Sequence, residues 1–350
     1  MVLLLSETDI AGLVSMSDCV RVIEHALGQH AAGGNHVIPR VGADVPGNGG
    51  AFRIMAAILP DYGFFGLKTL TGYPGRRLPG ETYFALLLFS CETGALRAIM
   101  AGSRLTGIRT GAASGVAAKY LSRGDAKVLG VIGAGVQARH QVAALREVRP
   151  LTTIRVFDID HAKAETFARE IELDFQVDAA PVVHAKQAVE GCDLVVTATA
   201  AQSPVLDGNW LEEGTHVSGV GSNAPNKREL DDTVFRRSRI VVDFKEQTLQ
   251  EAGDLRQAIE SGAVRVDAID AELGELITGN KQGRRDDREI TLFKSVGMAI
   301  EDIATATFAY EQAMAIGAGT RLHLDGASVS AMPDQARGLG ARSASIGAQR

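Results

Sequence analysis

The stretch VLGVIGAGVQARH, residues 128–140, constrains the fold of this chain more than any other stretch. It places Gly133, Gly135 and Ala138 in a G-x-G-x-x-A pattern, directly after an apolar run and at the start of a helical pattern. The first glycine of such a turn permits the sharp reversal, the second lets a pyrophosphate approach the backbone, and the alanine lets helix and strand pack closely. The free N–H groups of the helix then face the phosphates. The stretch therefore predicts a dinucleotide site.

The sequence around this motif alternates between short apolar runs and amphipathic helical patterns. Most of the runs are continuously apolar, which is typical of parallel strands buried on both faces. The candidate strands are AKVLGVIG, TIRVFD, DLVVTAT, THVSGVG and RIVVDF, with EITLFKSVG as a further strand or crossing segment. This alternation predicts an α/β fold, with a Rossmann-type doubly wound parallel sheet over residues 123–298.

Asp158 ends the second of these candidate strands, where a Rossmann fold places the acidic residue that accepts hydrogen bonds from the adenosine ribose. A carboxylate at this point would repel a 2′-phosphate, so NAD(H) is favoured over NADP(H). Asp160 competes for the same role, and the nearby His161 and Lys163 leave NADP(H) open.

The first 122 residues follow a different, strand-rich pattern. Residues 2–5 predict a short strand, and Ser6 with Asp9 resembles the capping box of a first helix. From 37 to 101, short apolar runs separated by Gly, Pro and Asp predict antiparallel strands, with the hairpin turn CETG between the last two. A small-residue helix over 104–121 closes this unit.

These patterns predict two domains. A strand-rich α+β domain is expected to comprise residues 1–122 together with about 299–325, and the Rossmann domain residues 123–298. Residues 326–350 are rich in Gly, Ser, Ala and Arg with few apolar anchors, so we expect a disordered tail.

Composition and charge exclude some partners. The 350-residue chain has a formal net charge of −6 and no clustered basic face, so nucleic acid and anionic membrane are not expected partners. The arginine pairs at 76–77, 236–237 and 284–285 are isolated and are expected on the solvated surface.

The three cysteines are far apart, the start lacks a signal-peptide pattern, and no apolar stretch is long enough to span a bilayer. We therefore expect a reduced, cytoplasmic protein.

Three cations lie in mainly apolar or small-residue settings: Arg40 in IPRV, Lys68 in GLKTL and Arg109 in LTGIRTG. An unpaired buried charge is costly, so each of them needs a partner. One interpretation is that each cation reaches solvent or pairs with a protein carboxylate. The other is that the three together hold a substrate carboxylate, which arginine grips with two hydrogen bonds. Both interpretations stay open at this point.

The chain has no metal-ligand motif such as HExxH and no G-x-S-x-G turn, so no metal site is expected. His216, within GTHVSG, is expected to be a core histidine rather than a ligand. Hydride transfer to nicotinamide needs neither a metal nor a protein nucleophile, which fits a dehydrogenase.

The stretch VGSNAPNK, residues 220–227, follows an apolar run and has the composition of an ordinary turn. It also lies at the carboxyl end of a predicted Rossmann strand, where such folds bind their ligands. Asn223 is therefore either turn chemistry or part of a reaction site.

Seven stretches, taken in order, resemble the ornithine cyclodeaminase/μ-crystallin family over about residues 2–316. They are PRV, GLKTLTGYP, LTGIRTGAASGVAAKYL, GVIGAGVQA, VVTATA, VGSNAPNKREL and ITLFKSVGMAIED. The family includes ornithine and lysine cyclodeaminases, an archaeal alanine dehydrogenase, ketimine reductases and μ-crystallin. The resemblance implies a homodimer joined through the strand-rich domain, with a small amino acid or imino acid as substrate.

The resemblance also implies roles for individual residues. Arg40, Lys68 and Arg109 would hold the substrate carboxylate, with Val296 on the substrate side. Arg109 would also reach the cofactor. The further cofactor contacts that it implies, besides Gly133 and Gly135, are Thr82, Val136, Gln137, Asp158, Thr199, Val220, Lys227 and Ser295.

The chain departs from the family pattern at Asn223, where cyclodeaminases carry an aspartate proposed to manage protons on the substrate amine. An amide cannot act as a general base near neutral pH, although it can orient a nitrogen by hydrogen bonding. The leading hypothesis is therefore an NAD(H)-dependent oxidoreductase acting on the C–N bond of a small amino acid or its imine, with Lys68 and Asn223 as catalytic residues. The alternatives are an ornithine cyclodeaminase that forms L-proline and ammonia, and a non-catalytic binding protein similar to μ-crystallin.

Overall fold

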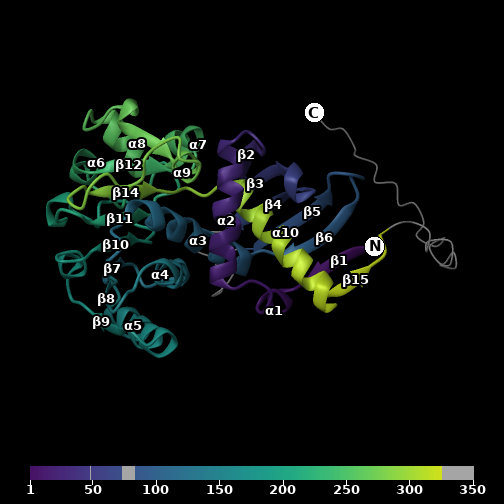
Figure 1. Ribbon diagram of the computed structural model, residues 1–350, viewed down its shortest axis with the longest axis horizontal. Coiled ribbons are helices and arrows are strands. Elements are labelled where there is room, and N and C mark those ends of the chain that lie inside the picture. The colour runs from purple at the N-terminus through teal and green to yellow at the C-terminus, as the bar shows by residue number, and fades with distance from the viewer. Residues whose placement is uncertain (48, 73–82, 325–350) are drawn as a thin grey trace, which may run out of the picture.

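The computed structural model describes residues 1–47, 49–72 and 83–324. Within these ranges the strands form a seven-stranded sheet and an eight-stranded sheet. Figure 1 shows the two sheets side by side, with α2 (Met16–Ala31) and α3 (Ser103–Leu121) between them. The Rossmann-type α/β fold with a second, strand-rich sheet is confirmed.

The mixed sheet, as we name the seven-stranded one, has the order β15-β1-β6-β5-β4-β3-β2. Its central strands pair antiparallel, whereas β1 pairs parallel with β6. Its strands are β1 (Val2–Leu5), β2 (His36–Val45), β3 (Gly50–Leu59), β4 (Phe64–Gly72), β5 (Tyr83–Ser90), β6 (Leu96–Ala101) and β15 (Thr320–Leu322). The predicted capping box of Ser6 and Asp9 is present, and so is the hairpin turn between β5 and β6.

The parallel sheet, as we name the eight-stranded one, has the order β13-β12-β14-β11-β10-β7-β8-β9. Starting from β7, the chain adds β8 and β9 on one side and then β10 and β11 on the other side. The order of strand addition therefore switches at β7, as in a doubly wound nucleotide-binding fold. Its strands are β7 (Val128–Ile132), β8 (Thr153–Phe157), β9 (Asp178–Pro181), β10 (Leu194–Thr197), β11 (His216–Gly219), β12 (Arg239–Val242), β13 (Ile269–Glu272) and β14 (Thr291–Lys294).

Helices connect and cover these strands. The other α-helices are α1 (Glu7–Ile10), α4 (Val136–Val148), α5 (His161–Phe175), α6 (Asp232–Arg237), α7 (Lys245–Glu251), α8 (Gly253–Glu260), α9 (Leu273–Ile277) and α10 (Ala299–Ile316). Short 3-10 helices are η1 (Pro60–Tyr62), η2 (Ala185–Ala188), η3 (Gly208–Trp210) and η4 (Val266–Ala268). The residues of α10 return the chain to the mixed sheet, where β15 pairs with β1.

The segment EITLFKSVG, predicted as a further strand or crossing segment, forms a strand, β14. It lies between β11 and β12, a position that matters for the site and that the sequence did not predict. β9 and β13 were not predicted, because DAAP and IDAE lack a clear apolar run. The insertion brings residues 295–297 next to the end of β11.

α3 joins the two sheets by close packing on α4. A Cβ atom on Gly111 would lie 2.3 Å from the carbonyl oxygen of His140, so only glycine permits this approach. α3 also contacts α2, α10 and β14, and one continuous apolar core includes side chains from both sheets. Arg109 on α3 is thereby placed between the two halves of the molecule.

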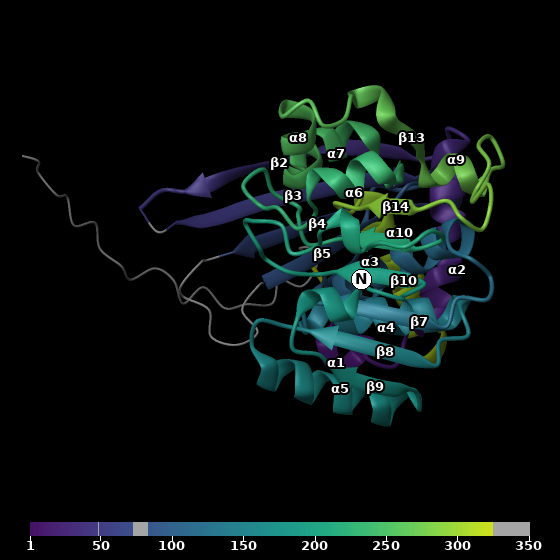
Figure 2. The same ribbon diagram turned by 90° about the vertical axis from the view of Figure 1, so that its left-hand side faces the viewer.

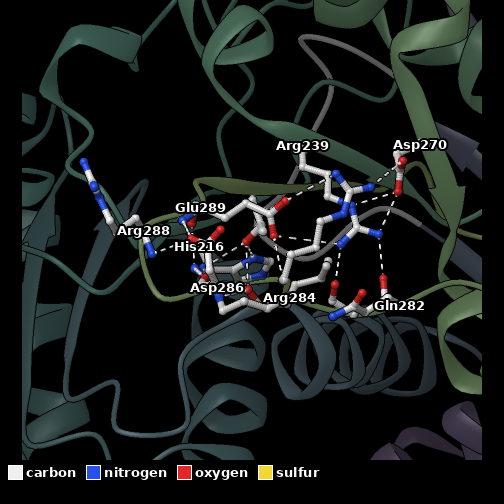
Figure 3. A network of polar contacts seen from close by, with 12 residues as sticks. His216, Arg239, Asp270, Gln282, Arg284, Asp286, Arg288 and Glu289 are labelled. Atoms are coloured by element: carbon white, nitrogen blue, oxygen red, sulfur yellow. Dashed lines mark hydrogen bonds and ion pairs between the residues drawn. The ribbon is translucent and has the colours of Figure 1, made fainter.

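A polar network at the amino ends of the parallel strands holds the segment before β14, as Figure 3 shows. Arg284 donates hydrogen bonds to the carbonyl groups of Leu121, Asp286, Glu289 and Gly214 and to the Thr291 hydroxyl. The expectation that both arginines of the pair 284–285 lie in solvent is wrong for Arg284, because these acceptors converge around its guanidinium.

His216 belongs to the same network and is confirmed as a core histidine. Its side chain is fully buried, and its Nδ1 lies 2.9 Å from the Thr291 hydroxyl. Burial, with a smaller contribution from Arg284, lowers the pKa of His216 to about 3, so the ring stays neutral.

Within the described ranges, no helix combines the length and the apolar character needed to cross a bilayer. Thr82, the arginine pair at 76–77 and the predicted tail at 326–350 lie outside the described residues. The domain boundaries drawn from the sequence stay a prediction.

Candidate active site

The carboxyl ends of five adjacent parallel strands form the edge at which the predicted cofactor residues meet. The last residues of β8, β7, β10, β11 and β14 stand in one register, from Phe157 through Ile132, Thr197 and Gly219 to Lys294. The predicted residues that directly follow these strand ends, or lie two residues on, are Asp158, Gly133, Thr199, Val220 and Ser295. Doubly wound sheets bind ligands in the crevice at this edge.

The glycine turn has the geometry that a dinucleotide requires. Gly133 adopts a φ of 102°, and a Cβ atom there would lie 2.7 Å from the carbonyl oxygen of Ala198, so glycine is required. At Gly135 a Cβ atom would meet nothing within 4 Å, which leaves open space over the start of α4. No side chain of the described residues caps α4, and its first N–H groups are available to a phosphate.

The residues that follow the turn also fit a bound dinucleotide. Val136 is 75% exposed although it is apolar, and the Oε1 atom of Gln137 is buried without a partner among the described residues. An exposed apolar side chain and an unpaired buried acceptor are both satisfied when a ligand covers them. Val136 and Gln137 therefore fit the role that the family resemblance implies for them.

The geometry separates the two candidate acidic residues after β8. Asp158 accepts hydrogen bonds from the backbone N–H of Ala134 at 2.8 Å and of Asp160 at 2.9 Å, so its carboxylate lies beside the glycine turn. Asp160 instead caps α5, accepting from the N–H of Lys163. Asp158 is the acid that adjoins the turn, and Asp160 has a structural role.

Glu229 organises the same edge and was missed from the sequence. It is fully buried and accepts five hydrogen bonds, from the Thr197 hydroxyl, the Thr199 hydroxyl and N–H, and the N–H groups of Gly221 and Ser222. The donors lie at the ends of β10 and β11, so one carboxylate holds the loops after both strands. The only signal was an acid inside the charged run KRELDD, where a solvated side chain is the ordinary expectation.

Lys68 and Arg109 meet at one carboxylate on α10. Lys68 lies in β4 on the face covered by α10, and its Nζ donates to Asp302 Oδ1 at 2.6 Å. Arg109 donates from Nε to the same oxygen at 2.9 Å and from NH1 to Glu301 Oε2 at 2.7 Å. The exposed fraction of these four side chains is at most 7%. Both cations therefore pair with protein carboxylates, as the first interpretation of them expects.

Arg40 approaches this pair from β2, where the register shifts between Ile38 and Val41. Such a bulge redirects a side chain out of the regular pleat. The Arg40 guanidinium pairs with Glu251 of α7 and donates to the carbonyl oxygens of Val296 and Gly297, each at 3.1 Å. We name Arg40, Lys68 and Arg109 the cation cluster. Arg40 is its most accessible member, with a side chain that is 15% exposed.

Burial and mutual repulsion shift the pKa values of this cluster. Burial lowers the pKa of Lys68 to about 7, opposed by Asp302 and assisted by Arg109 and Arg40. Burial raises the pKa of Glu301 to about 7, with Arg109 opposing. Burial acts to lower the pKa of Arg109, but Asp302 and Glu301 together raise it above its usual range. Lys68 of the cluster and its neighbour Glu301 are therefore the two groups whose pKa values lie near neutral pH.

Asp243 fixes the backbone between β14 and α10. Its Oδ2 accepts from the Ser295 hydroxyl at 2.9 Å and from the N–H groups of Val296 and Gly297 at 2.8 and 2.6 Å. Gly297 in turn presents its carbonyl to Arg40. The predicted residues Ser295 and Val296 thus lie between the strand edge and the cation cluster.

Asn223 lies in the loop after β11, and its Oδ1 accepts from Lys227 Nζ at 2.8 Å. Asn223 is exposed, and the hydrogen bonds of the described residues do not join it to the cation cluster. The loop nonetheless packs on the junction of α7 and α8, because the Ser222 hydroxyl accepts from the N–H of Asp254 at 3.1 Å. Since Glu251 at the end of α7 pairs with Arg40, this junction connects the Asn223 loop to the cluster.

The chain matches the sequence model of the ornithine cyclodeaminase/mu-crystallin family over residues 1–317. It belongs to that family. It is 36% identical to an alanine dehydrogenase of Archaeoglobus fulgidus over 322 residues, which is 91% of this chain and 98% of that protein.

Solved structures of relatives superimpose over nearly the whole chain. One is Thermococcus litoralis Delta(1)-pyrroline-2-carboxylate reductase in complex with NADH and L-proline, with 41% identity and a TM-score of 0.89, covering 91% of this chain and 100% of that one. Another is an archaeal alanine dehydrogenase dimer with bound NAD, with 35% identity and a TM-score of 0.87, covering 93% and 99%.

Proposed function

We propose that this protein is an NAD(H)-dependent oxidoreductase that acts on the C–N bond of a small amino acid or its cyclic or acyclic imine. The observation that carries the proposal is that an open glycine turn and a cluster of three cations both lie at the carboxyl edge of the parallel sheet. The relatives named as an alanine dehydrogenase and a pyrroline-2-carboxylate reductase support the same reaction class.

In this proposal the dinucleotide lies over the turn at Gly133 and Gly135, with its phosphates at the start of α4. Asp158 beside the turn favours NAD(H), because a carboxylate there repels a 2′-phosphate. The loops held by Glu229 carry Thr199 and Val220 toward the cofactor. When bound, the nicotinamide supplies or accepts a hydride.

The cation cluster would bind the substrate carboxylate. Arg40 is the most accessible of the three cations, and its Nε is buried without a partner among the described residues. A substrate carboxylate can use this donor and compete with Glu251 for the guanidinium. Arg109 and Lys68, held by Asp302, would contribute the remaining positive charge.

Lys68 would move the one proton that the reaction needs. Reduction of an imine adds a hydride to carbon and a proton to nitrogen, and a lysine whose pKa is about 7 can give that proton near neutral pH. Asn223 would orient the substrate nitrogen, and Val296 would contact the substrate side chain. Neither of these residues can itself transfer a proton near neutral pH.

A substrate panel tests the proposal. We expect the purified protein to consume NADH with Δ1-pyrroline-2-carboxylate or with pyruvate plus ammonia, and to form NADH from NAD with L-proline or L-alanine. The measurement is absorbance of NADH in both directions. Tight NADH binding without turnover of any imine or amino acid would instead favour a non-catalytic binding protein.

Ornithine cyclodeaminase activity is the alternative, and Asn223 is the residue that decides it. We expect no proline from ornithine with catalytic NAD in the wild-type protein, because the amide cannot titrate. Asn223→Asp restores a titratable group and should raise any such activity, measured as proline and ammonia released. An unchanged product profile would show that Asn223 does not discriminate between the two reactions.

The proposal includes a cytoplasmic homodimer joined through the mixed sheet. Exposed apolar side chains on β2, β3 and β5 support this face as the interface, namely Ile38, Val41, Phe52 and Tyr83. Figure 2 shows the β2–β3 hairpin extending outward from the rest of the molecule. Light scattering should give twice the chain mass, and Val41→Lys should weaken association.

A further inference from the structure

Asp302 joins two buried cations through a single oxygen. Its Oδ1 accepts from Lys68 Nζ at 2.6 Å and from Arg109 Nε at 2.9 Å, and the exposed fractions of the Lys68 and Asp302 side chains are both 1%. A shared acceptor fixes both nitrogens relative to each other, because moving either one breaks a charge-assisted hydrogen bond. The other oxygen, Oδ2, is buried without a partner among the described residues.

Asp302 is also the negative group that faces Lys68 directly. Among the described residues, the cations that act most strongly on Lys68 are Arg109 from α3 and Arg40 from β2, and the ring of Phe84 from β5 lies 5.6 Å from Nζ. Glu301 bonds to Arg109 instead and faces Asp243, which directly follows β12. From α2, the thiol of Cys19 faces Glu301 and Arg109, and burial raises its pKa to about 12, so it stays neutral.

We propose that Asp302 is a positioning residue that keeps Lys68 protonated and fixes its separation from Arg109 for the reaction. The inference rests on the proposed function. As a hydride adds to the imine carbon, the C=N π electron pair moves to the imine nitrogen and takes a proton from Lys68 Nζ. The side chain of Lys68 is then a neutral amine and regains a proton from water. Asp302 stabilises the protonated form in a site where burial and two other cations oppose it.

The decisive variant is Asp302→Asn, which keeps the shape and one acceptor oxygen but removes the charge. In the wild-type protein, kcat for imine reduction should fall as the pH rises through about 7, where Lys68 loses its proton. This fall is the alkaline limb of the pH profile of kcat. In Asp302→Asn this limb should move to lower pH by about 1–3 units, the range for loss of a close opposite charge. A limb that stays in place would overturn the proposal.

Glu301→Gln is the matched control, because it removes a buried carboxylate from the same helical turn without touching Lys68. It should leave the limb where it is. A limb that moves in Glu301→Gln and not in Asp302→Asn would assign the titration to Glu301 and contradict the proposal.

A second measurement does not depend on activity. Lys68 has a lowered pKa in the folded protein, so unfolding takes up a proton above pH 7 and stability rises from there toward 10.5. In Asp302→Asn this rise should begin at lower pH, measured by urea unfolding without cofactor. Wild-type protein inert toward every imine would refute the proposed function, whereas an unchanged onset in the variant would refute the role of Asp302.

If Asp302→Asn does not fold, Asp302→Glu replaces it. The longer carboxylate retains the charge but displaces the shared oxygen, so we expect the limb near its wild-type pH and kcat at least about tenfold lower. A kcat equal to that of the wild type would contradict the positioning role.

Discussion

Two groups of cationic side chains lie at opposite edges of the parallel sheet and differ in how fully they are paired. At the amino edge, Arg284 donates five hydrogen bonds, four of them to backbone carbonyls, and Arg239 bonds to Asp270 and to two further carbonyls. At the carboxyl edge, Arg40 Nε, Glu301 Oε1 and Asp302 Oδ2 are buried and lack partners among the described residues.

The difference separates a structural network from a reactive one. A buried polar group with no partner destabilises the fold, so an arginine that only holds a loop is surrounded by acceptors until it is satisfied. Donors and acceptors that stay without a partner beside a ligand crevice can form hydrogen bonds with a bound substrate. The amino edge therefore holds the chain in place, and the carboxyl edge is the place for chemistry.

Replacing Lys68 by Met tests the carboxyl edge with the largest expected effect. The apolar side chain fills a similar volume but has no proton to give, so turnover of the imine should fall by about 10²–10⁴-fold. NADH binding, measured by fluorescence, should persist because the glycine turn is untouched. Turnover within about threefold of the wild type would remove Lys68 from the mechanism and weaken the comparison.

Replacing Arg284 by Met tests the amino edge. Several carbonyl groups lose their donor, so the free energy of unfolding should fall by about 2–4 kcal/mol while kcat at a permissive temperature is unchanged. Arg288→Met is the control, since that side chain is 79% exposed and pairs with an exposed Glu213, and we expect no measurable change in the free energy of unfolding. Urea unfolding measures both, and a large loss of kcat in Arg284→Met would contradict the division between the edges.

Glu229→Gln tests whether the fully hydrogen-bonded carboxylate of Glu229 also supports cofactor binding. An amide carries one acceptor oxygen and one NH₂ group, so some of the five donors around Glu229 would lose their acceptor. The loops after β10 and β11 should loosen, and the Kd for NADH should rise about tenfold. Calorimetric titration checks this, and an unchanged Kd would limit Glu229 to a role in folding.

Glu301→Gln gives the smallest expected effect, a change in how stability depends on pH. The pKa of Glu301 is raised in the folded protein, so its contribution to stability is present below its unfolded value of 4.5 and is lost as pH rises through about 7. The variant should flatten this decline between pH 4.5 and 7 in urea unfolding. A decline as steep as that of the wild type would assign it to another group.

The local motifs of the site could be predicted, and their partners could not. The glycine turn and Asp158 follow from a strand, a turn and a helix that are contiguous in sequence. Lys68 is separated from Asp302 by 234 residues and Arg109 from Glu301 by 192, so no local pattern links them. Glu229 was missed for a related reason, because its donors come from two loops that only the sheet brings together.

By itself, the sequence determined the Rossmann-type alternation, the glycine turn, the family and the three cations, because these depend on residue spacing and side-chain chemistry within short stretches. The tertiary structure alone decided that β14 enters between β11 and β12, that α10 places two acids against Lys68 and Arg109, and that Arg284 is a structural residue. The physical reason is that burial and pairing are properties of contacts distant in sequence. The same arginine or acid is solvated, structural or reactive according to what packs around it.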